Sequence, residues 1–239
     1  MKTHVYPTAA DTSRHLILYF IGIMEKEPEK IFHFAFSGGS TPSLMFELWA
    51  AEYKDRTPWE RMRIYWVDER CVAFDDPDSN YGTMRRLLLN EVNMPDEYVF
   101  PIYAFRDPRV EAKRYSGQVV GTLPLEHSSP AFDVVLLGAG EDGHTSSIFP
   151  GQEQLLSSSQ PYEASVNPYN GQQRIAMTGY LIFKARKVIF LITGENKAAV
   201  VRDILQWEDT GPAAYVAHHA SDVEIFTDVQ AAGTEGNFI

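Results

Sequence analysis

The segment AFDVVLLGAGEDGHTSSIFPG (131–151) places a short apolar run directly before a glycine-rich loop. The same pattern, an apolar run that stops at glycine or charge, recurs in KIFHFAF (30–36), RMRIYWV (61–67) and KVIFLIT (187–193). Short runs rich in β-branched and aromatic residues are typical of parallel strands that are covered on both faces. The sequence therefore predicts a buried parallel strand in each of these segments.

Helical patterns fill the chain between these strands, at 41–53, 78–90, 109–123 and 196–207. Because strands and helices alternate, we expect an α/β fold with an open, mostly parallel sheet and helices on both faces, in a Rossmann-like arrangement. No repeat or clear linker interrupts the pattern, so residues 1–239 are expected to form a single domain. The segments 124–130 and 157–173 are the most loop-like.

The composition narrows the classes of partner. The 239 residues include 44% hydrophobic residues and carry a formal net charge of −11, without the dense Lys and Arg run that nucleic-acid binding requires. No apolar stretch approaches the roughly 18 residues that span a membrane, and residues 1–22 do not resemble a signal peptide. We therefore expect a cytoplasmic protein with no nucleic-acid or membrane partner.

The glycines of the opening segment match a dinucleotide-binding fingerprint, G-x-G-x-x-G, through Gly138, Gly140 and Gly143. That fingerprint is normally followed by a long helix, a second strand and an acidic residue about 20 positions on. Here Pro150 arrives soon after His144, and a serine-rich polar stretch follows. The pattern therefore argues against dinucleotide binding.

Ligands of open α/β sheets bind beyond the carboxyl ends of the strands, so the loops there are the place to seek a site. SGGSTP follows one predicted strand, and its Gly38 and Gly39 allow close backbone approach while Ser40 and Thr41 offer hydroxyls. Such a loop is typical of an anion cradle. The alternative is an ordinary capped turn with Thr41 as the helix N-cap.

Charged residues follow the other predicted strands. His144 is suited to proton transfer near neutral pH, with Asp142 placed to orient it; the alternative is that His144 caps a short helix at 145–149. Asp68 and Arg70 would orient or clamp a substrate, or form an internal ion pair.

Two further cations lie at the start of a strand and of a helix. Arg174 and Lys197 together would neutralise a phosphate dianion, and Lys197 opposes the helix dipole there, which favours a ligand role; the alternative for each is a solvated surface cation. The single cysteine, Cys71, and the remaining histidines, including His218 and His219, lack metal-binding spacing. No metal site is therefore expected.

The chain carries, in this order, the motifs SGGSTP (37–42), VDERCV (67–72), DSNYG (78–82), GAGEDGHTSSIFPG (138–151), RIAMT (174–178) and GENKAAVV (194–201). This set closely resembles the 6-phosphogluconolactonases of the pentose phosphate pathway, over roughly residues 8–228. The resemblance implies the open α/β fold of the glucosamine-6-phosphate deaminase/6-phosphogluconolactonase superfamily. It also implies a small phosphorylated sugar lactone as substrate and no cofactor.

The resemblance further implies a role for each matching residue. His144 would be the general base that activates water against C1 of the lactone, and Asp142 would orient it. Arg70 would contact the substrate. The phosphate would be held by the remaining matching residues, which are Gly38, Gly39, Ser40, Thr41, Arg174 and Lys197. Glu195, a negative charge near the expected phosphate, departs from the pattern, and both a monomer and a homodimer remain open.

Two other functions were weighed. The related deaminases carry an acidic residue five positions after the histidine, where this chain has Phe149, and tend to have tyrosine in place of Arg70. Both differences favour lactone hydrolysis over deamination or isomerisation of an amino-sugar phosphate. A non-catalytic sugar-phosphate sensor is the third hypothesis, and the presence of both His144 and Asp142 speaks against it.

Overall fold

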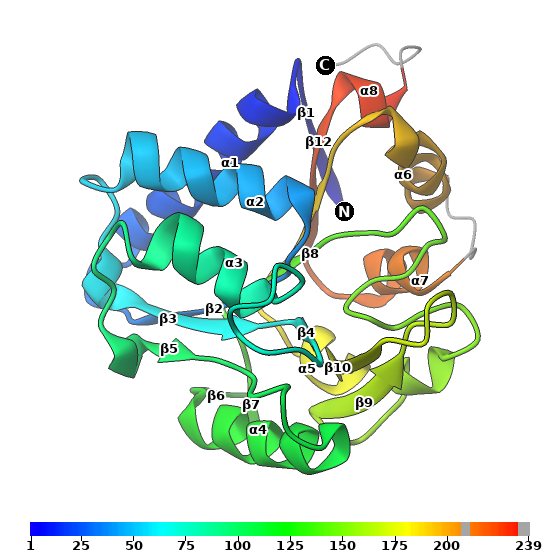
Figure 1. Ribbon diagram of the computed structural model, residues 1–239. Coiled ribbons are helices and arrows are strands. Elements are labelled where there is room, and N and C mark those ends of the chain that lie inside the picture. The colour runs from blue at the N-terminus through cyan, green and yellow to red at the C-terminus, as the bar shows by residue number, and fades with distance from the viewer. Residues whose placement is uncertain (207–210, 234–239) are drawn as a thin grey trace.

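A seven-stranded parallel sheet forms the centre of the protein (Figure 1), in a computed structural model that describes residues 1–206 and 211–233. Its strand order is β1-β12-β11-β8-β2-β3-β5. The strands are β1 (Lys2–Tyr6), β2 (Phe32–Phe36), β3 (Met62–Trp66), β5 (Val99–Phe100), β8 (Val134–Leu137), β11 (Val188–Ile192) and β12 (Val223–Asp228). The strands predicted from the apolar runs are β2, β3, β8 and β11, which lie side by side in the sheet.

Helices cover both faces of this sheet, as expected. The helices are α1 (Ala9–Lys26), α2 (Ser40–Leu48), α3 (Asn80–Met84), α4 (Pro108–Thr122), α5 (Gly179–Ile182), α6 (Ala198–Leu205), α7 (Pro212–His219) and α8 (Val229–Ala232). Figure 1 shows α1, α2 and α3 together on one side, with α4 and α5 on the opposite side. The helical pattern predicted at 196–207 corresponds to α6, and its last residue lies outside the described part of the chain.

Short one-turn segments complete the helical structure. π-helical turns at Trp49–Tyr53 and Arg85–Leu89 extend α2 and α3, and 3₁₀ turns lie at Trp59–Arg61, Asp96–Tyr98, Glu153–Leu156 and Glu195–Lys197. No helix within residues 1–206 and 211–233 is both long and apolar enough to cross a membrane.

A second sheet was not predicted. It is antiparallel, with the order β4-β10-β9, and consists of β4 (Asp68–Arg70), β10 (Gln173–Met177) and β9 (Tyr162–Val166). The expectation of loops was therefore wrong for 68–70 and for 162–166, whereas 167–172 does form a loop between β9 and β10. Both segments are polar, and they become strands only through pairing with β10, which lies far from β4 in the sequence.

The segment 124–130, expected to be a loop, contains a small hairpin. Strands β6 (Leu125–Glu126) and β7 (Ser129–Pro130) pair across a two-residue turn. His127 and Ser128 at this turn have φ values of 48° and 68°, the left-handed conformation that such turns require.

The edge strand β1 is tied to its neighbour β12 through a buried carboxylate. Glu224 accepts hydrogen bonds from the Tyr19 hydroxyl at 2.6 Å and from Lys187 Nζ at 2.7 Å, and its other oxygen lies 2.6 Å from His4 Nε2. Burial acts to raise the pKa of Glu224, but the hydrogen bonds from Lys187 and Tyr19 outweigh it and lower the pKa to about 2. The charged carboxylate therefore stabilises the folded chain.

Replacing this carboxylate should weaken the fold in a pH-dependent way. Because the folded pKa lies below the unfolded value, the stabilisation is present above about pH 4.5 and is lost as the pH falls toward 2. We expect Glu224→Gln to lower the free energy of unfolding by about 2 kcal/mol at pH 7. This loss is smaller than that expected on breaking a fully buried ion pair, because water reaches part of the network. Urea unfolding at several pH values measures this.

The matched control is Glu47→Gln, which changes an exposed residue of α2. Its free energy of unfolding should stay near that of the wild type at every pH. Equal pH dependence of wild type and Glu224→Gln below pH 4.5 would contradict the assignment of this acid-sensitive term to Glu224.

Candidate active site

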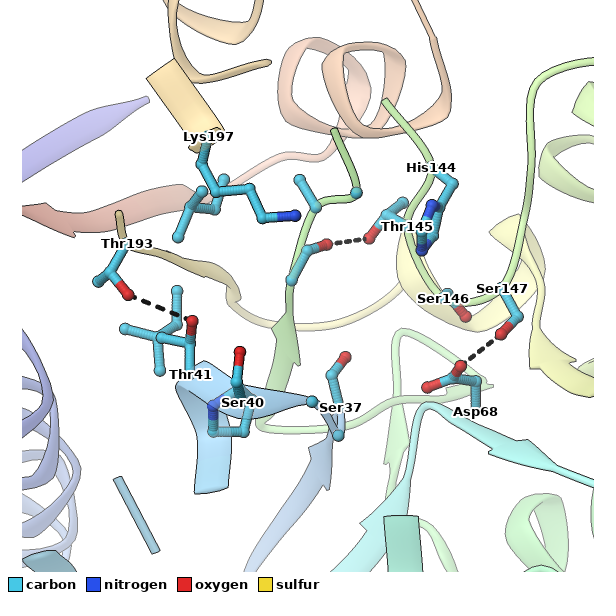
Figure 2. A pocket seen from close by; sticks show the side chains of 18 of the residues that line it. Ser37, Ser40, Thr41, Asp68, His144, Thr145, Ser146, Ser147, Thr193 and Lys197 are labelled. Carbon is cyan, nitrogen blue, oxygen red and sulfur yellow. Dashed lines mark hydrogen bonds between the residues drawn. The ribbon is translucent and has the colours of Figure 1, made fainter. Parts of the chain in front are cut away.

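One pocket lies at the carboxyl ends of the central strands, where loops from both sheets meet (Figure 2). Its lining consists of 37–42, Asp68, Arg70, 138–140, 144–147, Arg174, 191–193 and Lys197. The pocket has a volume of about 190 Å³, below the roughly 300–1,000 Å³ typical of sites for drug-sized ligands. It therefore suits a single sugar rather than a dinucleotide. Every predicted site residue lines it except Asp142, which contacts His144 instead.

The loop after β2 forms one wall of the pocket. Gly39, with φ 107°, is the N-cap of α2, so the alternative of Thr41 as N-cap is wrong. No side chain caps this helix, which leaves the first N–H groups of α2 available to an anion. The Thr41 hydroxyl instead lies 3.2 Å from that of Thr193 at the end of β11, and this contact joins the two loops.

Gly38 is required for a reason that the sequence did not reveal. A Cβ at this position would lie 1.8 Å from Oδ1 of Asn80, the first residue of α3. The Asn80 amide in turn donates to the backbone oxygen of Asp68 at 2.9 Å and to its carboxylate at 3.2 Å. Gly38 thus makes room for the side chain that positions Asp68. Asn80 was not identified as a site residue, although it lies within the motif DSNYG.

Two arginines from the second sheet face the pocket. Arg70 of β4 lies directly opposite Arg174 of β10, and Nε of each is buried without a hydrogen-bond partner among the described residues. Burial lowers the pKa of Arg174. A buried guanidinium nitrogen with no partner favours an anionic or hydroxyl-bearing ligand.

Asp68 and Arg70 do not form the internal ion pair that was the alternative. The Asp68 carboxylate accepts hydrogen bonds from the Ser147 hydroxyl and the Asn80 amide, whereas Arg70 Nη1 donates to the backbone oxygen of Asp78 at 2.7 Å. Their charges are thus directed to separate partners, and both side chains still border the pocket.

His144 and Asp142 form a close pair. Nδ1 of His144 lies 2.6 Å from Oδ1 of Asp142. Burial acts to raise the pKa of Asp142, but the His144 ring and the Tyr169 hydroxyl outweigh it and hold the pKa below its ordinary value. The ionised carboxylate assigns the ring proton to Nδ1 and leaves the lone pair of Nε2 for a water molecule. This is the geometry of a general base.

The His144–Asp142 pair requires a glycine at position 140 of the glycine-rich loop. A Cβ on Gly140 would lie 2.1 Å from His144 Nδ1 and 2.4 Å from Asp142 Oδ1. Gly140 was noted only as part of a dinucleotide pattern, yet the structure shows that it leaves space for the two side chains. Its role could not be read from the spacing of the glycines.

The segment after His144 is a tight turn, so the alternative of a helix at 145–149 is wrong. Thr145 and Ile148 exchange two backbone hydrogen bonds, and the two residues between them, Ser146 and Ser147, have φ values of 51° and 52°. The Ser146 hydroxyl donates to the backbone oxygen of Met177 at 2.8 Å. Together with the Ser147 bond to Asp68, this ties the turn to the second sheet.

Lys197 enters the pocket from the end of β11. It is the N-cap of α6 and forms no ion pair among the described residues. Figure 2 shows its ammonium group extending toward Thr145, above the hydroxyls of Ser40 and Thr41. The turn that carries it is anchored by the Gly194 N–H, which donates to the Asp228 carboxylate at 3.0 Å. Glu195 is exposed and does not line the pocket.

The pocket is locally cationic in an acidic protein. Among the described residues that line the pocket, Arg70, Arg174 and Lys197 face one carboxylate, Asp68. The whole chain, by contrast, carries a formal charge of −11. Within residues 1–206 and 211–233, no three His, Cys, Asp or Glu side chains are grouped as a metal ion would need. The arrangement combines a base, hydroxyls and cations, which suits proton transfer on an anionic, hydroxyl-rich substrate.

The chain is similar to a known family of sugar-phosphate proteins along most of its length. The family described as glucosamine-6-phosphate isomerases/6-phosphogluconolactonase matches residues 7–225, and the chain belongs to this family. Among curated relatives, the 6-phosphogluconolactonase of Treponema pallidum is 34% identical over 92% of this chain and 89% of its own. That of Haemophilus influenzae is 34% identical over 80% of this chain and 79% of its own.

Solved structures show the same fold. The 6-phosphogluconolactonase of Trypanosoma brucei superposes with a TM-score of 0.85 at 28% identity, covering 98% of each chain. A monomeric glucosamine-6-phosphate deaminase superposes with a TM-score of 0.82 at 21% identity, covering 97% of this chain and 99% of its own. The predicted open α/β fold of this superfamily is therefore confirmed.

Proposed function

We propose that this chain hydrolyses 6-phospho-D-glucono-1,5-lactone to 6-phospho-D-gluconate, the lactonase step of the oxidative pentose phosphate pathway. The observation that carries the proposal is the His144–Asp142 pair at the edge of a pocket with three cations. The names of the curated relatives support the same reaction.

The chemistry follows from this geometry. Nε2 of His144 takes a proton from water while the water oxygen bonds to C1 of the lactone, giving a tetrahedral oxyanion. The bond from C1 to the ring oxygen then breaks, and the ring oxygen takes the proton back from His144. The products are a carboxylic acid, which ionises, and a free hydroxyl. A base of this kind contributes roughly 10²- to 10⁴-fold to the rate.

The phosphate serves as a remote handle. In this proposal it binds to the N-terminal turn of α2, with Ser40 and Thr41, and to Lys197 and Arg174. Arg70 and Asp68 contact the sugar. Binding energy gathered at the phosphate then positions C1 next to His144.

Deamination or isomerisation of an amino-sugar phosphate is disfavoured at this site. Phe149 holds the position at which the deaminases carry an acid; it is buried, with its ring 4.6 Å from that of His144. An apolar ring cannot relay a proton. We further propose that residues 1–239 form one domain, because no clear linker interrupts the sequence. We also propose that the enzyme is cytoplasmic and acts as a monomer or homodimer.

Acid release from freshly prepared 6-phosphogluconolactone tests the function. This lactone also opens unaided, so the rate must be compared with a protein-free blank. Acceleration over the blank supports the proposal. No acceleration, together with release of ammonia from glucosamine 6-phosphate, would replace it with deamination. Binding of 6-phosphogluconate without turnover would replace it with a sensor.

The phosphate handle makes a separate prediction for Lys197→Ala. We expect KM for the phosphorylated lactone to rise about 30-fold, since a hydrogen bond to a charged group is worth about 2 kcal/mol. Hydrolysis of unphosphorylated glucono-1,5-lactone should be unchanged, because it has no phosphate to lose contact with. Initial rates with both substrates measure the difference.

A suitable control is Lys184→Ala, since Lys184 lies over the Tyr180 ring and away from the pocket. It should leave KM for both lactones unchanged. An equal loss of activity toward both lactones in Lys197→Ala would show that Lys197 acts on the reacting ring rather than on the phosphate.

A further inference from the structure

The carboxylate of Asp142 is held on one side only. Its Oδ1 accepts from the backbone N–H of His144 at 3.2 Å and contacts the ring nitrogen at 2.6 Å. Its Oδ2 is buried and has no hydrogen-bond partner among the described residues. A buried acceptor without a donor costs free energy, and a carboxylate held through one oxygen can rotate away from the histidine that it orients.

A possible donor to this carboxylate lies in the neighbouring β9–β10 loop. Tyr169, in the loop between β9 and β10, has its hydroxyl beside the Asp142 carboxylate, and this proximity raises the pKa of the phenol and helps to lower that of the acid. The Tyr169 ring also meets Phe149 edge-on, with centroids 6.5 Å apart. Phe149 in turn packs against His144. Tyr169 is therefore coupled to Asp142 through its hydroxyl and to His144 through the ring of Phe149.

The loop that carries Tyr169 is built to hold it there. The N–H of Tyr169 donates to the Asn167 side chain at 2.9 Å, and Asn167 exchanges backbone hydrogen bonds with Gly171 and Gln172. The β9 strand is fixed to the active-site turn by the Ser165 hydroxyl, which donates to the backbone oxygen of Ser147 at 2.8 Å. Tyr169 nevertheless remains 69% exposed. Packing does not explain such exposure of a large ring beside Phe149, the residue that contacts His144.

From this geometry we infer that Tyr169 is a positioning residue, whose hydroxyl donates to Oδ2 of Asp142 and holds the carboxylate against His144 during lactone hydrolysis. Tyr169, Asp142 and His144 then form one chain of hydrogen bonds from the rim of the pocket to the attacking water. The inference rests on the proposed function. It adds a third member to the catalytic pair, drawn from a segment expected to be a surface loop.

The variant Tyr169→Phe keeps the ring on Phe149 and removes only the hydroxyl. We expect kcat to fall about 5-fold to 10-fold, the effect of one hydrogen bond, while KM stays within about twofold because Tyr169 makes no contact with the phosphate end of the site. In an Asp142→Asn background the same substitution should have no further effect on kcat, since the two residues act through one another.

The control is Tyr180→Phe, on α5 and outside the pocket, which should leave kcat unchanged. An unchanged kcat in Tyr169→Phe would overturn the inference. So would an equal fall in kcat with and without the Asp142 carboxylate, because Tyr169 would then act without Asp142.

A second measurement needs no turnover. A ¹³C NMR titration of side-chain carboxyl groups, with the Asp142 signal assigned by its absence in Asp142→Asn, should show a higher pKa for Asp142 in Tyr169→Phe than in the wild type. The direction follows because loss of a donor destabilises the charged form. An unchanged pKa would overturn the inference even if the chain hydrolyses the lactone. A raised pKa in a chain without lactonase activity would instead locate the failure in the proposed function.

Discussion

His144→Ala is expected to lower kcat for 6-phosphogluconolactone by about 10³-fold, within the range of roughly 10² to 10⁴ for loss of a general base. The substitution removes the only histidine among the described residues that line the pocket, and it leaves the cations and the α2 loop in place. KM should therefore change by less than about threefold, because the phosphate handle is intact. Acid release after subtraction of the protein-free rate measures both constants.

His219→Ala is the matched control for this experiment. His219 is exposed on α7, with its ring stacked on Tyr215 and outside the pocket. The variant should keep wild-type kcat. A folded His144→Ala protein that retained most of its turnover would refute the assignment of the base and would direct attention to Asp68, the one carboxylate lining the pocket.

Gly140→Ala is expected to lower kcat by about 10²-fold, although it alters no group that takes part in the reaction. A new Cβ 2.1 Å from His144 Nδ1 must displace the ring or its partner Asp142, and a shift of about 1 Å in a reacting group costs on this order. The φ of Gly140 is not positive, so the backbone can accept alanine. Steady-state kinetics should show the loss in kcat rather than in stability.

Two comparisons make this prediction specific. Gly117→Ala, in α4, adds a Cβ that meets nothing within 4 Å and should leave kcat unchanged. In a His144→Ala background, Gly140→Ala should cause no further fall in kcat, because the imidazole ring that the new Cβ would displace is already absent. A full additional loss there would mean that Gly140 is needed for something other than space for the pair.

The central sheet could be predicted because its strands are contiguous apolar runs. Strands β8 and β11 are buried along their whole length, so local hydrophobicity alone reveals them. It could also be predicted that the loops meet at one site, because parallel strands bring their carboxyl ends to one edge of the sheet. His144 and Lys197 were therefore identified from the sequence and are found in one pocket.

What could not be predicted depends on contacts between distant segments. Strands β4 and β9 are polar, and only pairing with β10 makes them strands. The sequence suggested that Gly38 lets the backbone approach a ligand and that Gly140 belongs to a dinucleotide pattern. Each instead clears space for a side chain that the sequence does not place next to it. Tyr169 lies in a stretch without apolar periodicity, so nothing local indicated that it would influence the pKa of Asp142.

The pairing of β1 with β12 also bears on how the protein is made. Among the described strands, β1 pairs with β12 alone. Because β1 comes early in the sequence and β12 late, β1 leaves the ribosome long before its partner has been synthesised. The carboxylate that anchors the Lys197 turn, Asp228, is the last residue of β12. A nascent chain that ends before β12 therefore has an unpaired β11 edge and an unsupported Lys197. The proposed binding of the sugar phosphate should therefore emerge only after β12 has been synthesised and has paired with β11 and β1.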